Sequence, residues 1–531
     1  MNQKVWISIP QSIISTHNPE FMQCILSKVN GKKRVLYCYN KYILYGKVGE
    51  IAKKYLKLEF NIKFEILYQQ IIRNGEEEDC FGQIIGIQFH FDYGIGMISS
   101  KLGGSENQIK ELRNFLRSRI NQFKFHKYFR VFKKIGKGNF ATVYFTERIE
   151  DGQQFAVKAF SKQVAYNEEN GKDSIINEIQ IMRELNNKHL MKLYEVYETE
   201  NSLYMVLELL SGGSLYDLIK DKKGLKLKEV QQLLAGIMLG LEEMHSKDIM
   251  HRDLKLENIL FKKKNQLQSV VIADFGLATH VNQNQYLYYR CGTPGYVAPE
   301  VINYKDNNEK YSSICDIYSL GLIFYILLSG RPAFLGKTYK MIVKQNRQAM
   351  IDFSIKQFKS LPEDVMDLLK KMLEKDPKIR SDIKICLNHS FIGNVAKQIQ
   401  NTEFNEDSDN DDIGQIDEDN DVGKRINQIN QQYFVFEASK NLNSPNSSSD
   451  DSPGLILKKA TKKQKEIDSC MYLSGQSPLF KGQIDTIGSI HSLDIQSPQL
   501  NQQLSPVIKQ SKFAQNKQKG NQGILKYVTK N

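Results

Sequence analysis

The chain has 531 residues, of which 41% are hydrophobic and 25% are charged. These fractions are close to the globular average and exclude a collagen-like, wholly disordered or membrane-embedded chain. Lys and Arg together number 73 against 60 for Asp and Glu, which gives a formal net charge of +13. The excess favours anionic partners but by itself leaves ATP, phospholipid and nucleic acid all open.

The cysteines and the apolar runs indicate a cellular compartment. The seven cysteines are scattered, odd in number and contain no CxxC pair. This pattern is typical of a reducing compartment and argues against a disulfide framework or a zinc ribbon. The starting sequence MNQKVWISIPQ lacks the charged and apolar regions of a secretory signal. The longest apolar run, residues 320–328, is too short to span a bilayer, so we expect a cytoplasmic protein in which this run is a buried core helix.

Residues 1–125 are predicted to form a separate small β-rich domain. β-type stretches at 33–45, 55–67 and 84–91 precede an amphipathic helix over 106–123. The apolar positions of that helix recur at helical spacing, so one face of it is expected to pack on the strands.

The next segment, residues 130–392, alternates short β-type runs with longer helical patterns such as 228–246. Strands and one helix come first and mostly helices follow, which predicts a two-lobed α+β catalytic unit with a ligand cleft between the lobes. From residue 402 the chain is rich in Asn, Gln and Ser and loses its apolar periodicity. Such a segment buries too little apolar surface to offset its ordering entropy, so residues 402–531 are predicted to be a disordered tail.

A glycine-rich sequence, GKGNFATV, lies between two β-type runs. Gly136 and Gly138 would let the backbone approach phosphates closely, and Val143 on the following strand would cover an adenine face. Taken alone, the fragment fits a plain hairpin turn equally well. Lys158 then follows in an apolar strand, with Glu178 in a later helical stretch. A phosphate on one side and Glu178 on the other would satisfy this lysine, and a structural ion pair is the alternative.

Two further motifs, HRDLKLEN and DFG, carry the groups that phosphoryl transfer needs. The reaction requires a carboxylate to accept the hydroxyl proton, oxygen ligands for Mg²⁺ and cations on the phosphates. Asp253 supplies the carboxylate, and Asn258 with Asp274 supplies the metal ligands. Lys158 and Lys255 supply the cations. The order of the four motifs argues against a purely structural explanation.

At these residues the chain resembles the eukaryotic protein kinases, over residues 130–392. The resemblance continues through the sequences GTPGY and APE to Asp316 and Arg380, and it implies that Asp316 anchors the catalytic loop and Arg380 pairs with Glu300. Lys255 together with GTPGY resembles the serine/threonine class, and CGTPGYVAPE resembles the calcium/calmodulin-dependent kinase group.

The resemblance implies a serine/threonine protein kinase that uses ATP and Mg²⁺ and acts on protein substrates. Its implied catalytic residues are Asp253, Lys255, Lys158 and Glu178, and its implied metal ligands are Asn258 and Asp274. The implied ATP site consists of Ile135, Gly136, Lys137, Gly138, Asn139, Phe140, Ala141, Val143, Ala156, Lys158, Glu208, Leu210 and Leu260. Two alternatives stay open: a pseudokinase scaffold, against which the intact charged motifs argue, and a membrane-recruited adaptor.

Two positions depart from the family pattern. Ala141 replaces the third glycine of the phosphate loop, which is expected to weaken ATP binding without abolishing it. Tyr289 stands where the family usually has a phosphorylated threonine, whose phosphate normally pairs with Arg252. Serine/threonine autophosphorylation therefore cannot switch on the activation segment, residues 277–292, at the usual site. We hypothesise that the kinase is active without it or is controlled elsewhere.

The tail gives little support for calcium control. Its acidic run, 403–421, does not match the ligand spacing of an EF-hand loop, and a solvated acidic linker is the preferred interpretation. A basic stretch at 458–465 leaves a nuclear-import or calmodulin-type segment open against a plain solvated charge run. Calmodulin binding is therefore unsupported, and no nucleic acid partner is expected.

The N-terminal pattern resembles a pleckstrin-homology (PH) domain, a seven-stranded sheet capped by a C-terminal helix. Lys32, Lys33 and Arg34 precede a strand roughly where such domains place basic phosphoinositide ligands. The resemblance implies a phosphoinositide membrane surface as a partner and peripheral membrane association. A protein ligand or a purely structural role are the alternatives for this domain.

Overall fold

The structure is a computed structural model, and it describes residues 5–10, 22–28, 31–69, 72–73, 76–77, 82–92, 97–138, 141–221, 224–305, 309–336 and 338–401. The predicted disordered tail lies outside these residues. Within them, no helix combines the length and the apolar character needed to cross a membrane. The apolar run at 320–328 lies in helix α8 (Ile314–Ser329), which is buried over almost its whole length, as predicted for a core helix.

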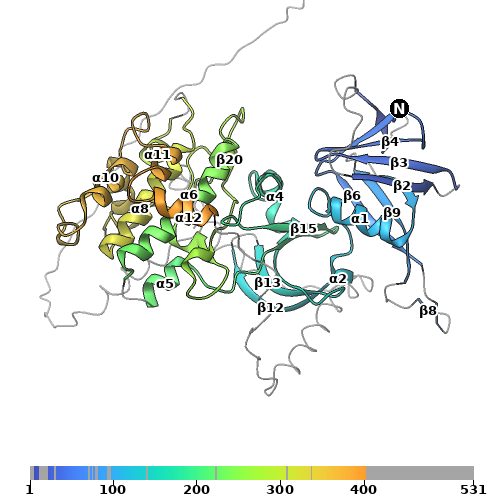
Figure 1. The fold of residues 1–531 in the computed structure, drawn as a ribbon, viewed down its shortest axis with the longest axis horizontal. Coiled ribbons are helices and arrows are strands. Elements are labelled where there is room, and N and C mark those ends of the chain that lie inside the picture. Colours follow the sequence, from blue (N-terminus) through green and yellow to red (C-terminus); the bar gives the residue numbers. More distant parts are fainter. Residues whose placement is uncertain are drawn as a thin grey trace, which may run out of the picture. The chain divides into compact units, whose positions relative to one another are not determined.

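The N-terminal region is a sheet of mostly antiparallel strands (Figure 1). Its strands neighbour one another in the order β1-β5-β4-β3-β2-β10-β9-β6. They are β1 (Ile7–Ser8), β2 (Met22–Lys28), β3 (Lys33–Cys38), β4 (Tyr42–Gly46), β5 (Lys54–Lys57), β6 (Ile62–Tyr68), β9 (Ile84–Asp92) and β10 (Met97–Gly103), beside the separate pair β7 (Ile72–Arg73) and β8 (Glu76–Glu77). All three predicted β-type stretches contain strands, and the first two each divide into two strands.

The core of this region forms between the strands and one helix. Phe64 and Phe89 face each other in register across β6 and β9 and are fully buried. Trp6 packs there too, stacked on Tyr45 with a centroid distance of 4.6 Å. The burial of such large aromatic surfaces supplies most of the favourable free energy of a small sheet domain.

Helix α1 (Glu106–Leu116) closes the N-terminal sheet. Ile109, Leu112 and Leu116 on its apolar face are fully buried, as the periodicity predicted, and Phe115 is partly buried. Ser105 begins the helix with a capping box formed with Gln108. The prediction that this helix continues to residue 123 is wrong. The helix ends at Leu116 because the polar residues that follow form the short strand β11 (Asn121–Gln122), whose backbone pairs with neighbouring strands.

The first half of the kinase-like segment contains a second group of strands and the helices α3 and α4, and the short helix α2 directly precedes it. In space the strands follow the order β15-β16-β14-β13-β12. The elements are α2 (Phe125–Tyr128), β12 (Phe129–Lys137), β13 (Ala141–Arg148), β14 (Gln154–Ser161), α3 (Lys162–Ala165), α4 (Gly171–Glu184), β15 (Leu193–Glu198) and β16 (Ser202–Leu207). The predicted β-type runs of this half and the predicted helical stretch around Glu178, which is α4, are confirmed.

The second half is mainly helical, and α6 and α8 lie at its centre in Figure 1. Its helices are α5 (Leu215–Asp221), α6 (Leu227–Ser246), α7 (Pro299–Ile302), α8, α9 (Tyr339–Gln348), α10 (Glu363–Met372), α11 (Ile383–Leu387) and α12 (Gly393–Asn401). Its short strands form two pairs, β17 (Ile249–Met250) with β20 (Thr279–His280) and β18 (Ile259–Phe261) with β19 (Val270–Ile272). The predicted helix over 228–246 corresponds to α6.

Strand β11 links the two groups of strands. It pairs in parallel with β6 on one side and with β15 on the other. The N-terminal strands and those of the kinase-like segment are therefore parts of one continuous sheet. The two side chains of β11 are buried, with 0% exposure for Asn121 and 2% for Gln122.

Candidate active site

Lys158 lies in the middle of the strands that surround the predicted nucleotide site. On β14 it stands opposite Val143 of β13 and Met205 of β16. Its Nζ lies 2.7 Å from Glu178 Oε1 on α4 and 3.3 Å from Asp274 Oδ1. The structure thus brings together the lysine, the helix carboxylate and the DFG aspartate that the sequence singled out.

The ionisation of these three groups is coupled. Burial alone would lower the pKa of Lys158, but the carboxylates of Glu178 and Asp274 outweigh it and raise that pKa. The positive charges of Lys158 and, to a smaller extent, Lys255 together lower the pKa of Asp274 to about 2, against the effect of burial. Burial raises the pKa of Glu178, while Lys158 opposes that shift. Lys158 and Asp274 are therefore both charged at neutral pH.

Asp253 is held by three donors. The Lys255 ammonium lies 2.9 Å from its Oδ2, and the Thr293 hydroxyl donates to its Oδ1 at 2.7 Å. Asn258 Nδ2 donates to the main-chain oxygen of Asp253 at 2.8 Å and to its Oδ2 at 3.2 Å. Lys255 also donates to Thr293 Oγ1, which closes a ring of polar contacts around the carboxylate. Thr293 belongs to the motif GTPGY, but the motif alone did not predict this role for it.

Asp316 fixes the backbone of the catalytic loop. Its two oxygens accept hydrogen bonds from the backbone N–H groups of His251 and Arg252, both at 2.8 Å. Arg252 has a φ of +67°, a left-handed conformation that costs a non-glycine residue energy. The fully buried Asp316, held in turn by His245, stabilises that turn. These contacts are those that the kinase resemblance implied for Asp316.

Asn258 and Asp274 meet through the β18–β19 pair. The residue before Asp274, Ala273, donates its N–H to the Asn258 carbonyl at 2.9 Å. Since the side-chain nitrogen of Asn258 is engaged by Asp253, its side-chain oxygen is the atom left to face a cation. One amide oxygen and one carboxylate are the hard donors that Mg²⁺ prefers, so these residues fit a divalent cation.

The glycine-rich segment forms the turn between β12 and β13. Gly136 stands opposite Val143 and Lys137 opposite Thr142, and Gly138 donates its N–H to the Ala141 carbonyl at 2.8 Å. Ile135, at the end of β12, is 47% exposed. The predicted ATP-site residues Asn139 and Phe140 lie outside the described residues.

The remaining predicted ATP-site residues lie along two neighbouring segments. Ala156 is in register with Leu207 at the end of β16, and the chain then passes Glu208 and Leu210 toward β18. Backbone hydrogen bonds from Ser211 to Lys262 and from Gly212 to Phe261 keep this connection beside Leu260. The Glu208 side chain forms an ion pair with Lys262 at 2.9 Å.

Arg252 binds the activation segment, residues 277–292, through backbone carbonyls. Its Nε donates to the Leu277 carbonyl at 2.7 Å, and its Nη1 donates to the carbonyl of Tyr288 and to the Tyr311 hydroxyl. Tyr311 in turn donates to the Tyr289 carbonyl at 2.8 Å. The sequence motifs gave no signal for Tyr311, because it lies outside them and meets Arg252 only in the folded chain.

The ring of Tyr289 packs among other tyrosines. It stacks on Tyr304 with a centroid distance of 5.0 Å and lies 5.4 Å from Tyr286. A second implied contact also forms: Arg380 binds Glu300 in a bidentate ion pair with distances of 2.6 and 3.0 Å. The loop that ends in APE is thus tied to the helical half of the domain.

Comparison with known proteins agrees with this geometry. The model of the family described as "Protein kinase domain" matches residues 129–392. Myosin light chain kinase A of Dictyostelium discoideum is 35% identical over 263 residues, which cover 49% of this chain and 86% of that protein. Calcium-dependent protein kinase 4 of Plasmodium berghei (strain Anka) is 34% identical over 269 residues, 50% of each chain. Probable serine/threonine-protein kinase 2 of Plasmodium falciparum (isolate K1 / Thailand) is 34% identical over 259 residues, 49% of each chain.

The chain therefore belongs to the protein kinase family, and its kinase domain is similar to those of serine/threonine kinases. A domain of this family uses ATP and a divalent metal and acts on protein substrates. The matches span about half the length of the Plasmodium relatives, and the family model begins at residue 129, after the N-terminal sheet.

Proposed function

We propose that the protein is an active serine/threonine protein kinase that transfers the γ-phosphoryl group of ATP to Ser or Thr hydroxyls of protein substrates. The observation that carries the proposal is the intact set of charged contacts. Lys158 is held between Glu178 and Asp274, and Asp253 is held by Lys255. A pseudokinase that has lost turnover usually lacks one of these groups, and none is lacking here.

Each residue has a defined part in the transfer. Asp253 orients the acceptor hydroxyl and takes its proton as the new O–P bond forms and the bond to the leaving ADP breaks. Lys158, positioned by Glu178, binds the α/β-phosphates. Lys255 neutralises charge that develops on the transferred group. Asn258 and Asp274 would hold Mg²⁺, which supplies further neutralisation of phosphate charge when bound.

The replacement Asp253→Asn tests the proposal, because it keeps the size of the side chain and removes the base. We expect nucleotide binding to be retained and the transfer rate to fall about 10²- to 10⁴-fold. Asp367→Asn on α10 is the matched control, since its carboxylate is 46% exposed and pairs with Lys371 and His389 of the helical half. Transfer of ³²P from ATP to a protein substrate and fluorescent-nucleotide binding are the measurements. A wild type that binds nucleotide without transfer would instead identify a pseudokinase.

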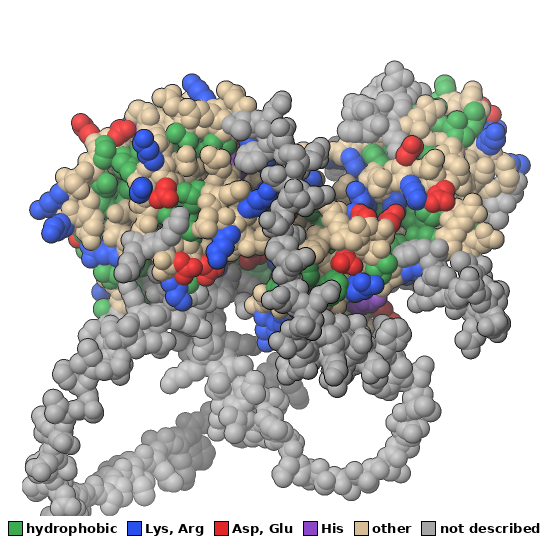
Figure 2. All heavy atoms as spheres, turned by 60° about the horizontal axis from the view of Figure 1, so that its bottom comes forward, with side chains coloured by type: hydrophobic (Ala, Val, Ile, Leu, Met, Phe, Trp, Pro, Cys, Tyr) green, Lys and Arg blue, Asp and Glu red, His purple; other side chains and the backbone are tan. Residues whose placement is uncertain are grey.

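For the N-terminal region we propose a PH-like domain. The strand order supports this: β5-β4-β3-β2 continues into β10-β9-β6, and helix α1 follows the last strand. Phosphoinositide binding, peripheral membrane association and a cytoplasmic location stay predictions. Lys32 is exposed directly before β3 and Lys33 is exposed at its first position, while charges of both signs are interspersed on the face seen in Figure 2. Liposome flotation with Lys32, Lys33 and Arg34 replaced by Ala tests the lipid prediction, and unchanged binding of the variant would contradict it.

A further inference from the structure

Strand β11 places two buried amides between the N-terminal sheet and the kinase domain. Asn121 Nδ2 donates to Glu198 Oε2 at 3.0 Å, and Gln122 Nε2 donates to Glu195 Oε2 at 2.7 Å. Both carboxylates lie on β15 of the kinase domain and are buried. Buried polar groups are costly unless they are paired. The contact of β11 with its neighbours β6 and β15, which we call the seam, is therefore specified by these hydrogen bonds as well as by backbone pairing.

Glu198 is contacted from both sides of the seam. Lys63 of the N-terminal strand β6 lies 3.0 Å from its Oε1, and Lys162 of the kinase domain lies 2.7 Å from the same oxygen. Asn121 occupies the other oxygen. These contacts fix the position of the Asn121 side chain, and they leave its Oδ1 able to accept a hydrogen bond from another residue.

The residue that donates to Asn121 Oδ1 lies on α4, the helix that carries Glu178. Arg183 of α4 donates from Nη2 to Asn121 Oδ1 at 2.9 Å. Its Nε is buried and has no hydrogen-bond partner among the residues that the structure describes. Five residues earlier on the same helix, Glu178 forms the ion pair with Lys158. One side of α4 is thus fixed to the seam while another side presents Glu178 to the nucleotide site.

We propose that Asn121 is a positioning residue for phosphoryl transfer. It fixes α4 through Arg183, and so keeps Glu178 within reach of Lys158. The N-terminal sheet, which fixes Asn121 through Lys63 and Glu198, thereby becomes part of the scaffold of the active kinase. The inference rests on the proposed kinase activity only for its catalytic consequence, because the fixing of α4 can be measured without turnover.

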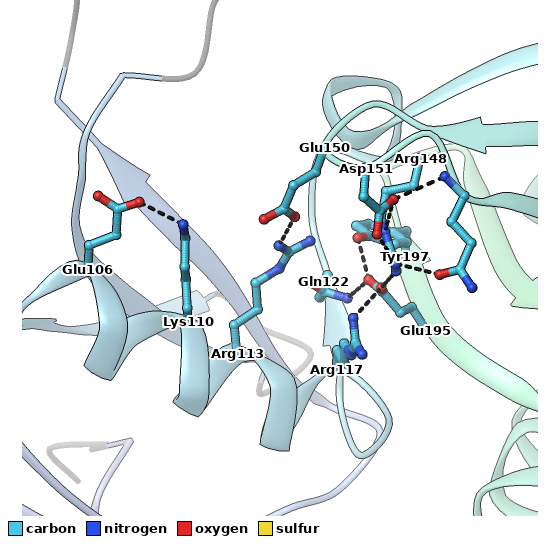
Figure 3. A network of polar contacts seen from close by, with 11 residues as sticks. Glu106, Lys110, Arg113, Arg117, Gln122, Arg148, Glu150, Asp151, Glu195 and Tyr197 are labelled. Carbon is cyan, nitrogen blue, oxygen red and sulfur yellow. Dashed lines mark hydrogen bonds and ion pairs between the residues drawn. The ribbon is translucent and has the colours of Figure 1, made fainter. Parts of the chain in front are cut away.

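The neighbouring residue provides a matched control. Gln122 is an equally buried amide on the same strand, but its partner Glu195 is held by Arg148, Arg117 and Tyr197 (Figure 3), and none of the described contacts of Glu195 reaches α4. The replacements Asn121→Leu and Gln122→Leu each remove one buried amide from the seam. Only the first also removes the partner of Arg183.

The experiment compares these two variants in the full chain. We expect Asn121→Leu to lose hydrogen-exchange protection of the amides of α4 and to lower kcat/KM for ATP about tenfold, the effect of losing one hydrogen bond to a charged group. Gln122→Leu is expected to keep both properties within twofold of wild type, although it should lose about as much thermal stability as Asn121→Leu. Arg183→Met, which leaves the seam intact, is expected to reproduce the effect of Asn121→Leu.

A double-mutant cycle then tests the coupling. If Asn121 acts through Arg183, the double variant Asn121→Leu/Arg183→Met loses no more activity than either single variant. Additive losses, or equal α4 protection in Asn121→Leu and Gln122→Leu, would overturn the proposal. A wild type without phosphotransfer would refute the proposed function alone, since the exchange measurement still decides whether Asn121 fixes α4.

Discussion

The activation segment is predicted to be ordered without phosphorylation, and Tyr311→Phe tests this most directly. The replacement keeps the ring, which is 6% exposed, and deletes the hydroxyl. That hydroxyl accepts a hydrogen bond from Arg252 Nη1 at 3.0 Å and donates to the Tyr289 carbonyl at 2.8 Å. In a phosphorylated kinase a phosphate would bind this arginine, and here a tyrosine and two backbone carbonyls bind it.

The size of the effect follows from the two bonds. A hydrogen bond to a charged group contributes about 1.5–3 kcal/mol and a neutral one about 1 kcal/mol. Arg252 keeps its bonds to Leu277 and Tyr288, so part of the ordering energy remains. We therefore expect the active arrangement to lose about 1.4–2.8 kcal/mol, which lowers kcat/KM about 10- to 100-fold.

The assay uses protein treated with phosphatase, so that only the intrinsic order of the segment is measured. Wild type is expected to remain active, Tyr311→Phe to lose activity and hydrogen-exchange protection over residues 277–292, and Tyr289→Phe to stay active. The last variant keeps the stacking on Tyr304 and the backbone carbonyl, and it cannot be phosphorylated. Activity that disappears with phosphatase and in Tyr289→Phe, with a phosphate found on Tyr289 by mass spectrometry, would refute the reasoning.

Two predictions concern stability. Burial lowers the pKa of His189 to about 4, although its hydrogen bond to the Val270 carbonyl opposes that shift. As pH falls from about 6.5 to 4, the unfolded state therefore binds a proton at His189 before the folded state does. The free energy of unfolding then falls by up to ~3 kcal/mol. His189→Asn should remove that slope from urea unfolding measured across this range, and an unchanged slope would contradict the assignment. Arg380→Lys loses the bidentate pair with Glu300 and should cost about 2–3 kcal/mol in the same assay, whereas Arg331→Lys, at an exposed pair, should cost less than about 0.5 kcal/mol.

The catalytic groups could be predicted from the sequence because each lies in a short motif whose local structure is strongly constrained. Asp253 and Asn258 share one loop, and Asp274 follows a strand that pairs beside that loop. The end of α1 could not be predicted, because Phe123 continues the apolar spacing of the helix although Asn121 is used by a strand. A two-residue strand of polar amides has no periodicity, and its partners are strands far away in the chain.

The same limit applies to Tyr311 and Arg183. Each meets its partner only through a long-range polar contact: Arg252 donates to the Tyr311 hydroxyl, and Arg183 donates to Asn121 Oδ1. A single polar contact of this kind leaves no pattern in neighbouring residues, in contrast to the buried face of a helix, which repeats every three or four positions. Motif spacing therefore predicts which groups do the chemistry, and only the folded structure identifies the groups that hold them in place.

The charges of the site explain why a divalent cation would be needed. The three carboxylates of Asp253, Glu178 and Asp274 are opposed by two ammonium groups, those of Lys158 and Lys255, and each ammonium is already paired. The set therefore has a formal charge of −1, which does not favour a triphosphate. Because Lys158 and Lys255 keep the pKa of Asp274 low, that carboxylate stays ionised and able to bind a cation. A divalent ion on Asp274 and Asn258 would reverse the sign of the local charge, so nucleotide and metal are expected to bind to this site together.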